Sequence, residues 1–259
     1  MKLSGVLLTL GGWLCLSGLG RAGAADLSAA TEPLPVVQVP KLTRPVELDG
    51  AGRNSAWGLA AVVELQDFWS ASEHPKTQAT RVSLMHDGLA LYIAFDCEDA
   101  EVLARCKDHD GQTFRDDCVE LFFGAPAERL SDTACFEINA LGTLADYYYR
   151  HTDWINYRFE SGAVIVASAL SAGDEDSGYR VEIKIPLASL APLMSFFQVG
   201  HEKLPPGATA GNSLRANFAR WDRSSPDAGK DRFSIWTHPG YSFPHPHRPE
   251  AYGWLVLAE

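Results

Sequence analysis

Short stretches that alternate between apolar and polar residues run along most of the chain, and this period of two predicts β-strands. The clearest stretch is 179–185, where Tyr179, Val181, Ile183 and Ile185 share one face and Arg180, Glu182 and Lys184 share the other. Pro186 ends this strand, and a short helical turn is expected over 187–193. Further strands are predicted over 163–170, 214–221 and 252–258, and the acidic turn 171–177 joins the first of these to 179–185.

Two hairpins are predicted from turn residues. Strands 80–86 and 89–96 flank Asp87-Gly88, the preferred pair for a two-residue type I′ turn. This register would place Leu84 opposite Leu91 and Val82 opposite Ile93, with the apolar positions on one face. A second hairpin joins 135–140 to 143–150 through Leu141-Gly142.

About nine or ten strands are expected, and no helical pattern exceeds two turns. With 259 residues, 46% of them hydrophobic, the chain can form a large core without a metal or disulfide. The predicted fold is an all-β, antiparallel β-sandwich of the immunoglobulin or jelly-roll kind, in a single domain over residues 44–259. Residues 25–43 are rich in proline and are interpreted as a leader that ends in an edge strand.

The first 24 residues have the pattern of a cleaved signal peptide. Lys2 gives a basic start, residues 3–20 are apolar, and Ala22-x-Ala24 offers the small residues of a cleavage site. Glycines interrupt the apolar run and Arg21 ends it, so the run is short for a membrane span. The prediction is a secreted or periplasmic protein with no membrane span.

The net charge and the cysteines indicate which partners are excluded and whether disulfides are expected. The net charge of −11 makes nucleic acid an improbable partner, because an acidic chain repels phosphate. Export would place the remaining cysteines in an oxidising compartment, where disulfides form. Three pairings are open to these four residues, with buried free thiols as the alternative: Cys97, Cys106, Cys118 and Cys135.

Carboxylates gather on neighbouring predicted strands. A two-residue turn at Leu141-Gly142 would place Glu137 opposite Asp146 and Asn139 opposite Leu144. Glu120 would approach Glu137 if strand 117–123 neighbours strand 135–140. Like charges across a ladder repel each other, so a cation, solvent or a ligand with hydroxyl donors must offset them. The patch is either a solvated face or the polar half of a sugar site, whose apolar half would be aromatic rings.

Metal binding and catalysis have weaker signals. Asp108-His109-Asp110-Gly111 and Asp174-Glu175-Asp176 are acidic turns that lack the full spacing of an EF-hand loop, and Asp108 and Asp110 are the candidate Ca²⁺ ligands. His238, His245 and His247 lie in a proline-rich loop and are interpreted as solvated. The chain contains no GxSxG, HExxH or phosphate-binding glycine loop, so no enzymatic activity is predicted.

Several segments, in this order, resemble carbohydrate-binding module family 9 and its relatives. They are Val46-Glu47-Leu48-Asp49-Gly50 with Trp57, the hairpin ending in Leu91-Tyr92-Ile93-Ala94-Phe95, Asp117-Cys118-Val119-Glu120-Leu121-Phe122, the run from Phe136 to Thr143 (FEINALGT), the run from Tyr179 to Pro186 (YRVEIKIP), and the run from His247 to Gly253 (HRPEAYG). The resemblance covers nearly all of residues 44–258.

The resemblance implies a β-sandwich that binds sugars without cleaving them, with structural Ca²⁺ in some members. Glucose, cellobiose or xylan ends are the implied ligands. By position, Phe114 corresponds to one wall of an aromatic clamp, Glu120 and Asn139 to residues that bind hydroxyls, and Glu137 to a polar residue on the same strand as Asn139. The second wall of the clamp falls on Pro246, which is not aromatic, and the candidate substitutes are Tyr241, Phe243 and His247.

Two other functions fit the same architecture. A haem-binding sandwich of the DOMON type would need Met85 with a loop histidine as axial ligands, since the adjacent Met85 and His86 face opposite ways on a strand. An interaction domain of the cell envelope would use the acidic face to meet a basic partner.

Overall fold

The structure is a computed structural model that describes residues 33–69, 75–124, 132–151, 154–172, 175–194, 204–209, 211–223 and 231–259. Residues 34–259 form one compact unit. The predicted signal peptide lies outside the described residues, as do Gly173 and Asp174 of the second acidic turn. Within the described part of the chain, no helix is long and apolar enough to cross a membrane.

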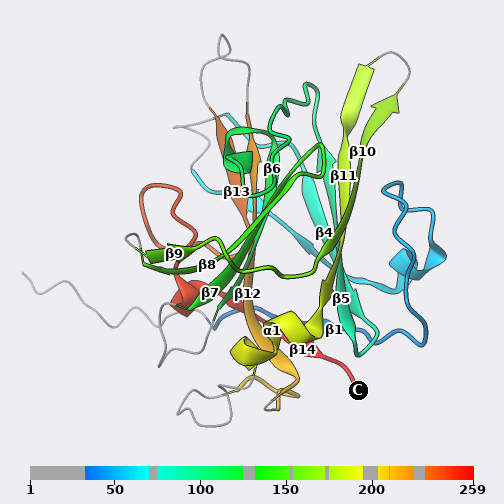
Figure 1. Ribbon diagram of the computed structural model, residues 1–259, viewed down its shortest axis with the longest axis vertical. Coiled ribbons are helices and arrows are strands. Elements are labelled where there is room, and N and C mark those ends of the chain that lie inside the picture. The colour runs from blue at the N-terminus through cyan, green and yellow to red at the C-terminus, as the bar shows by residue number, and fades with distance from the viewer. Residues whose placement is uncertain are drawn as a thin grey trace, which may run out of the picture. The chain divides into compact units, whose positions relative to one another are not determined.

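Two β-sheets pack face to face, as Figure 1 shows. The larger sheet has nine strands: β1 (Val36–Val39), β3 (Gln66–Asp67), β6 (Cys118–Gly124), β7 (Thr133–Asn139), β8 (Leu144–His151), β9 (Trp154–Asn156), β12 (Ser213–Asp222), β13 (Arg232–Ile235) and β14 (Gly253–Leu257). Its main order is β1-β14-β12-β6-β7-β8-β9, and β13 pairs with the second half of β12 and with β3.

The smaller sheet has five strands in the order β10-β11-β5-β4-β2. These are β2 (Ala61–Glu64), β4 (Thr80–His86), β5 (Ala90–Glu98), β10 (Val164–Ala172) and β11 (Glu175–Pro186). Helix α1 (Leu187–Met194) contacts strands of both sheets and lies at one end of the sandwich in Figure 1. The described residues also form three short 3₁₀ helices: η1 (Ser55–Leu59), η2 (Thr113–Arg115) and η5 (Pro249–Ala251).

The core lies between the sheets and uses the alternate positions that the sequence pattern predicts. From the smaller sheet it takes Tyr179, Val181, Ile183 and Ile185, and from the larger sheet Val119, Leu121 and Phe123, all of them buried. The β-sandwich prediction is confirmed, and so are the β10–β11 hairpin and helix α1. The sheet is mixed rather than wholly antiparallel, because the edge strand β1, which lies in the predicted leader, pairs in parallel with β14.

Both predicted hairpin registers are shifted. Leu84 faces Ile93 and His86 faces Leu91, so the two-residue loop is Gly88-Leu89 and not Asp87-Gly88. Gly88 has φ +86°, which suits the first position of a type II′ loop. Asp87 closes the loop, since its Oδ1 accepts hydrogen bonds from the backbone of Leu89 and Ala90. A shift of two residues leaves each side chain on its expected face.

The shift in the second hairpin is one residue, and it moves a carboxylate to the other face. Ile138 faces Leu144 and Glu137 faces Ala145, so Asp146 lies opposite Phe136. The loop holds three residues, the last of which is Gly142 at φ +82°, as a loop with a glycine bulge requires. The predicted Glu137–Asp146 pair is therefore wrong, because an odd register shift exchanges the faces of a strand.

All four cysteines among the described residues are free thiols, so the predicted disulfide is not present. Cys97, Cys118 and Cys135 are buried, and burial raises the pKa of each thiol. They behave as small apolar side chains that resist ionisation.

Candidate functional site

Two glutamates face each other on the outer side of the nine-stranded sheet. β6 pairs with β7 in a register that sets Glu120 directly opposite Glu137, as predicted for neighbouring strands. The side chains are nearly buried, with exposed fractions of 3% and 8%. Oε1 of Glu137 accepts a hydrogen bond from the Tyr147 hydroxyl at 2.6 Å, whereas Oε2 of Glu120 has no hydrogen-bond partner.

Burial raises the pKa values of both carboxyls in this pair. Burial raises the pKa of Glu120 well above its usual range, and the facing Glu137 raises it further. Burial also raises the pKa of Glu137, against the lowering effect of hydrogen bonds from Tyr147 and Thr113. The guanidinium of Arg223 lowers both pKa values. The pair therefore favours a form in which one of the two carboxyls carries a proton.

The 3₁₀ helix η2, which contains Phe114, lies next to the two glutamates. Thr113 is buried, and its hydroxyl lies 3.3 Å from Oε2 and 3.4 Å from the carbonyl oxygen of Glu137. The next residue, Phe114, is 39% exposed. Its carbonyl accepts hydrogen bonds from the guanidinium of Arg223, one of them at 3.1 Å from Nε. Phe114, Glu120 and Glu137 are thus linked through Thr113 and Arg223.

Sequence reasoning missed Thr113, Trp221 and Arg223. β12 lies beside β6 with Ala219 opposite Glu120, so Trp221 lies on the same outer face. Its side chain hydrogen-bonds Glu120 and lowers the pKa of that carboxyl. The guanidinium of Arg223 lies 3.8 Å from the centre of the Trp221 ring. The alternation of strand 214–221 could have pointed to Trp221, had β12 been paired with β6.

Asn139 lies on the same face, but its amide is fully used within the chain. Oδ1 accepts from the backbone N–H groups of Leu141 at 3.1 Å and Thr143 at 2.9 Å. Nδ2 donates to Cys106 O and to Asp116 Oδ2, both at 2.8 Å. These four bonds fix the three-residue hairpin loop and tie it to the segments on either side of η2. A sugar hydroxyl would have to displace one of them.

The other predicted aromatic residues form a cluster of rings. Tyr241, Phe243 and His245 have mutual ring-centre distances of 5.7–5.9 Å, in stacked orientations. His245 lies 5.4 Å from His247, which stacks on Tyr149 at 4.1 Å. The cluster therefore extends from the exposed Phe243 through His247 to Tyr149 on β8.

His247 lies between this cluster of rings and Tyr147, which hydrogen-bonds Glu137. Its ring centre lies 6.5 Å from that of Tyr147, the residue that hydrogen-bonds Glu137. Burial and the neighbouring His245 lower the pKa of His247 to about 3. The imidazole is therefore neutral at physiological pH and contributes a flat ring rather than a charge. Pro246, which the family resemblance places at the second wall of the aromatic clamp, is a buried proline in this loop.

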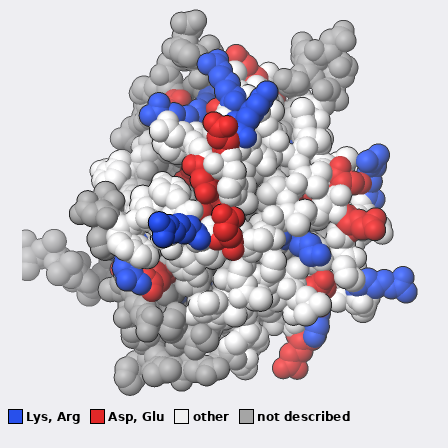
Figure 2. Space-filling view, in the orientation of Figure 1, with Lys and Arg blue, Asp and Glu red and all other residues white. Residues whose placement is uncertain are grey.

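Acidic side chains also form two groups with metal-ligand spacing. Asp110 lies with His109 and Asp146, whereas Asp108 is not part of this group. The second group is Asp99, Asp117 and Asp222. A cation of the protein occupies the second group, since Nη2 of the buried Arg220 lies 2.8 Å from Asp99 and 3.7 Å from Asp222. Figure 2 shows acidic side chains in a row near the middle of one face, flanked by basic ones.

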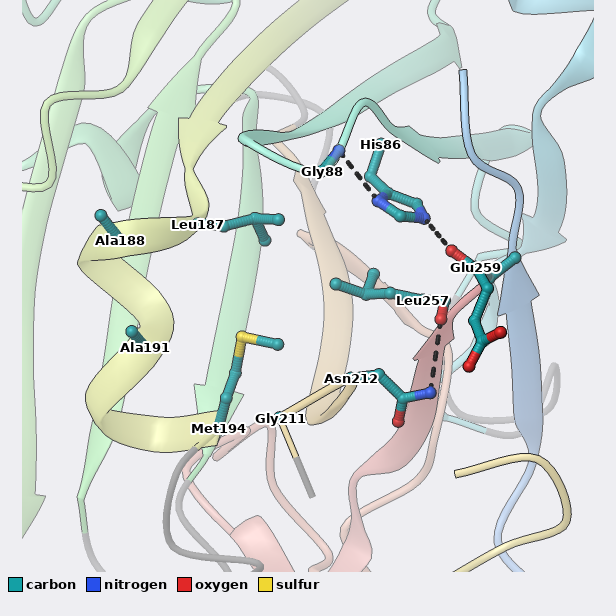
Figure 3. A pocket seen from close by; sticks show the side chains of 11 residues that line it. His86, Gly88, Leu187, Ala188, Ala191, Met194, Gly211, Asn212, Leu257 and Glu259 are labelled. Atoms are coloured by element: carbon teal, nitrogen blue, oxygen red, sulfur yellow. Dashed lines mark hydrogen bonds between the residues drawn. The ribbon is translucent and has the colours of Figure 1, made fainter. Parts of the chain in front are cut away.

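A cavity of about 430 Å³ lies elsewhere, between helix α1 and the end of β14 (Figure 3). Its lining is mainly aliphatic and includes Leu187, Met194 and Leu257 but no aromatic ring other than His86. Nε2 of His86 lies 3.0 Å from Ala258 O, and Nδ1 accepts from Gly88 N. Met85 is buried in an apolar cluster with Leu42 and Tyr92. Met85, which the haem hypothesis pairs with a loop histidine, is therefore enclosed by apolar side chains and does not line this cavity.

Comparisons with known proteins agree with this fold. The family model described as "Carbohydrate family 9 binding domain-like" matches residues 48–248. No curated protein matches the chain. A proposed carbohydrate-binding protein from Bacteroides uniformis has a similar structure, with a TM-score of 0.65 and 18% identity, covering 87% of this chain and 100% of that one.

Two structures of a family 9 carbohydrate-binding module from Caldicellulosiruptor kristjanssonii are also similar. The complex with glucose has a TM-score of 0.56 and 16% identity, covering 86% of this chain and 95% of that one. The complex with cellotriose has a TM-score of 0.57 and 17% identity, covering 86% and 93%. The fold and the match over residues 48–248 together define the class: the chain belongs to the carbohydrate family 9 binding domain-like family.

Proposed function

We propose that this protein binds carbohydrate, without cleaving it, on the outer face of the nine-stranded sheet. The observation that carries the proposal is the facing pair Glu120 and Glu137, next to the 3₁₀ helix η2 that carries the exposed Phe114. Oε2 of Glu120 is an acceptor with no partner, and sugar hydroxyls are donors that would complete it. A pocket with a few fixed polar groups and flat rings is the usual form of a small-ligand site.

Access to the glutamates is expected from the side of η2. The two carboxyls are nearly buried, while Phe114 and, to a smaller extent, the Arg223 side chain reach the surface. A sugar ring stacked on Phe114 would direct its hydroxyls towards the pair and towards the Arg223 guanidinium. In this arrangement Asn139 supports the hairpin loop beneath the site. The cluster that includes Tyr241, Phe243 and His247 is the proposed second aromatic surface, in place of the proline at 246.

The arrangement also supports a binding role rather than hydrolysis. Glycoside hydrolysis needs one carboxyl on each side of the scissile bond, at a separation set by the mechanism. Glu120 and Glu137 project side by side from adjacent strands on one face, an arrangement that favours contact with one side of a sugar over bracketing a glycosidic bond. In agreement with the signal-peptide pattern, we propose a secreted or periplasmic location.

Calorimetric titration with glucose, cellobiose and xylobiose tests the proposal. Phe114→Ala removes an exposed ring and Glu120→Gln removes one carboxylate; each is expected to weaken binding at least tenfold. Trp154→Ala is the matched control, since Trp154 is equally exposed (40% against 39%) but lies on β9. Equal affinity in Phe114→Ala and Trp154→Ala, or no heat with any sugar, would reject the proposed site.

A further inference from the structure

The strongest unexplained feature is a group of polar side chains at the edge of β8. Nε2 of His109 lies 3.7 Å from Oδ1 of Asp110, 3.6 Å from Oδ1 of Asp146 and 3.6 Å from Oε2 of Glu160. The first two residues come from the turn before η2, Asp146 from β8, and Glu160 from the loop after β9. Ligand atoms of His109, Asp110 and Asp146 all lie within 4.8 Å of one another, and Glu160 approaches this group from the side of His109.

Asp146 carries an observation that an ordinary acidic turn does not explain. Its side chain is 1% exposed, and its Oδ1 has no hydrogen-bond partner although it points at His109. Its other oxygen accepts a hydrogen bond of 2.7 Å from the backbone N–H of Ser161. A buried carboxylate oxygen without a partner is unfavourable unless a cation or donor completes it.

We propose that His109, Asp110, Asp146 and Glu160 form a binding site for a zinc ion. Around a tetrahedral Zn²⁺ with bonds of about 2.1 Å, ligand atoms lie about 3.4 Å apart. The distances from His109 Nε2 to the two aspartates, 3.6 and 3.7 Å, are close to this value, and the exposed Glu160 side chain would turn towards the ion as the fourth ligand. The ion would complete Oδ1 of Asp146 and join the three segments.

The donor set favours zinc over calcium. Calcium takes six to eight oxygen ligands, whereas an imidazole nitrogen suits zinc and related transition metals. The proposed ligands therefore differ from the calcium pair predicted from sequence: Asp110 is shared, Asp108 is not. The Asp99 group is a useful contrast, since the buried guanidinium of Arg220 already supplies its cation.

Local structure holds the two aspartates before any ion binds. The Ser161 N–H orients Asp146, and Oδ1 of Asp110 accepts a hydrogen bond of 3.2 Å from the backbone of Asp146. Such outer contacts are typical of metal sites. His109 and Glu160 are 51% and 72% exposed, so an ion can enter from solvent and these two side chains can close on it.

The test is titration of the full chain, without a histidine tag and after chelator treatment, with ZnCl₂ and separately with CaCl₂. We expect one zinc ion to bind at this site and to raise the unfolding temperature, with no comparable effect of calcium. His109→Ala should abolish this binding event, and Asp146→Asn should weaken it on the order of 100-fold or more, since even loss of an outer-shell contact costs 10–100-fold. Asp108→Asn, in the same turn, is the matched control and should bind as the wild type does.

Three outcomes would overturn the proposal. The first is no zinc binding, which would leave the group as a plain cluster of charges. The second is zinc binding that His109→Ala and Asp146→Asn do not change, which would assign the ion to other histidines or thiols. The third is tighter calcium binding. Circular dichroism checks folding, and His109→Ala alters an exposed side chain, so a fold defect does not obscure the result. Substitution with Co²⁺ should give no thiolate charge-transfer band, which separates this site from one at Cys106.

Discussion

Removing one hydroxyl from Tyr147 tests how the carboxylate pair is held. Tyr147→Phe keeps the ring and its packing against Tyr157 and His247, but deletes the donor to Glu137. The O···O distance of 2.6 Å lies in the range of charge-assisted hydrogen bonds. A bond of this kind, with both partners buried, contributes about 1.5–3 kcal/mol to stability. Burial also raises the pKa of Tyr147, so the hydroxyl remains a donor at all physiological pH values.

The assay is urea unfolding followed by tryptophan fluorescence. Tyr147→Phe should lower the free energy of unfolding by about 2 kcal/mol, whereas the control Tyr157→Phe, whose side chain is exposed, should change it by less than about 0.5 kcal/mol. In the double variant with Glu137→Gln, the loss of unfolding free energy should be smaller than the sum of the losses in the two single variants. Equal stability of Tyr147→Phe and Tyr157→Phe would refute the role of this hydrogen bond.

Three further changes have defined outcomes. Glu120→Gln should make the unfolding free energy less dependent on pH. A raised carboxyl pKa means that the folded chain binds more protons than the unfolded chain, so the contribution of Glu120 to stability falls as pH rises above about 4.5. Parallel pH profiles for wild type and variant would contradict this. Arg220→Met should cost about 3–5 kcal/mol, because Asp99 and Asp222 would lose their buried cation, and a loss below 1 kcal/mol in urea unfolding would argue against the ion-pair network. Asn139→Ala should cost on the order of 3 kcal/mol through the loss of the four loop bonds, while the affinity of the folded protein for sugar stays within about threefold, and a large loss of affinity at full stability would make Asn139 a sugar contact instead.

Much of the fold could be predicted from sequence because strands with one buried face carry a strict alternation. The run 179–185 shows this most clearly, and its four apolar residues all lie in the core. Turn geometry was harder to predict. Leu141-Gly142 has the composition of a two-residue turn, but the Asn139 side chain binds the backbone of Leu141 and Thr143 and so stabilises a three-residue loop. The resulting register places Asp146 opposite Phe136 and not opposite Glu137.

The site was only half visible in the sequence for a similar reason. Strand alternation brought Glu120 and Glu137 to one face, and the structure confirms that they face each other. Thr113 and Arg223 could not be found this way, because they reach the pair from η2 and from the end of β12. The grouping of His109, Asp146 and Glu160 likewise depends on three segments meeting at β8. No local pattern encodes such meetings.

A crystal structure of the protein with cellobiose would test the central claim most directly. The proposal predicts sugar density stacked on Phe114, with hydroxyls within 3.2 Å of carboxylate oxygens of Glu120 or Glu137. Density at another surface, such as the cavity beside helix α1, with the two glutamates unchanged, would contradict it.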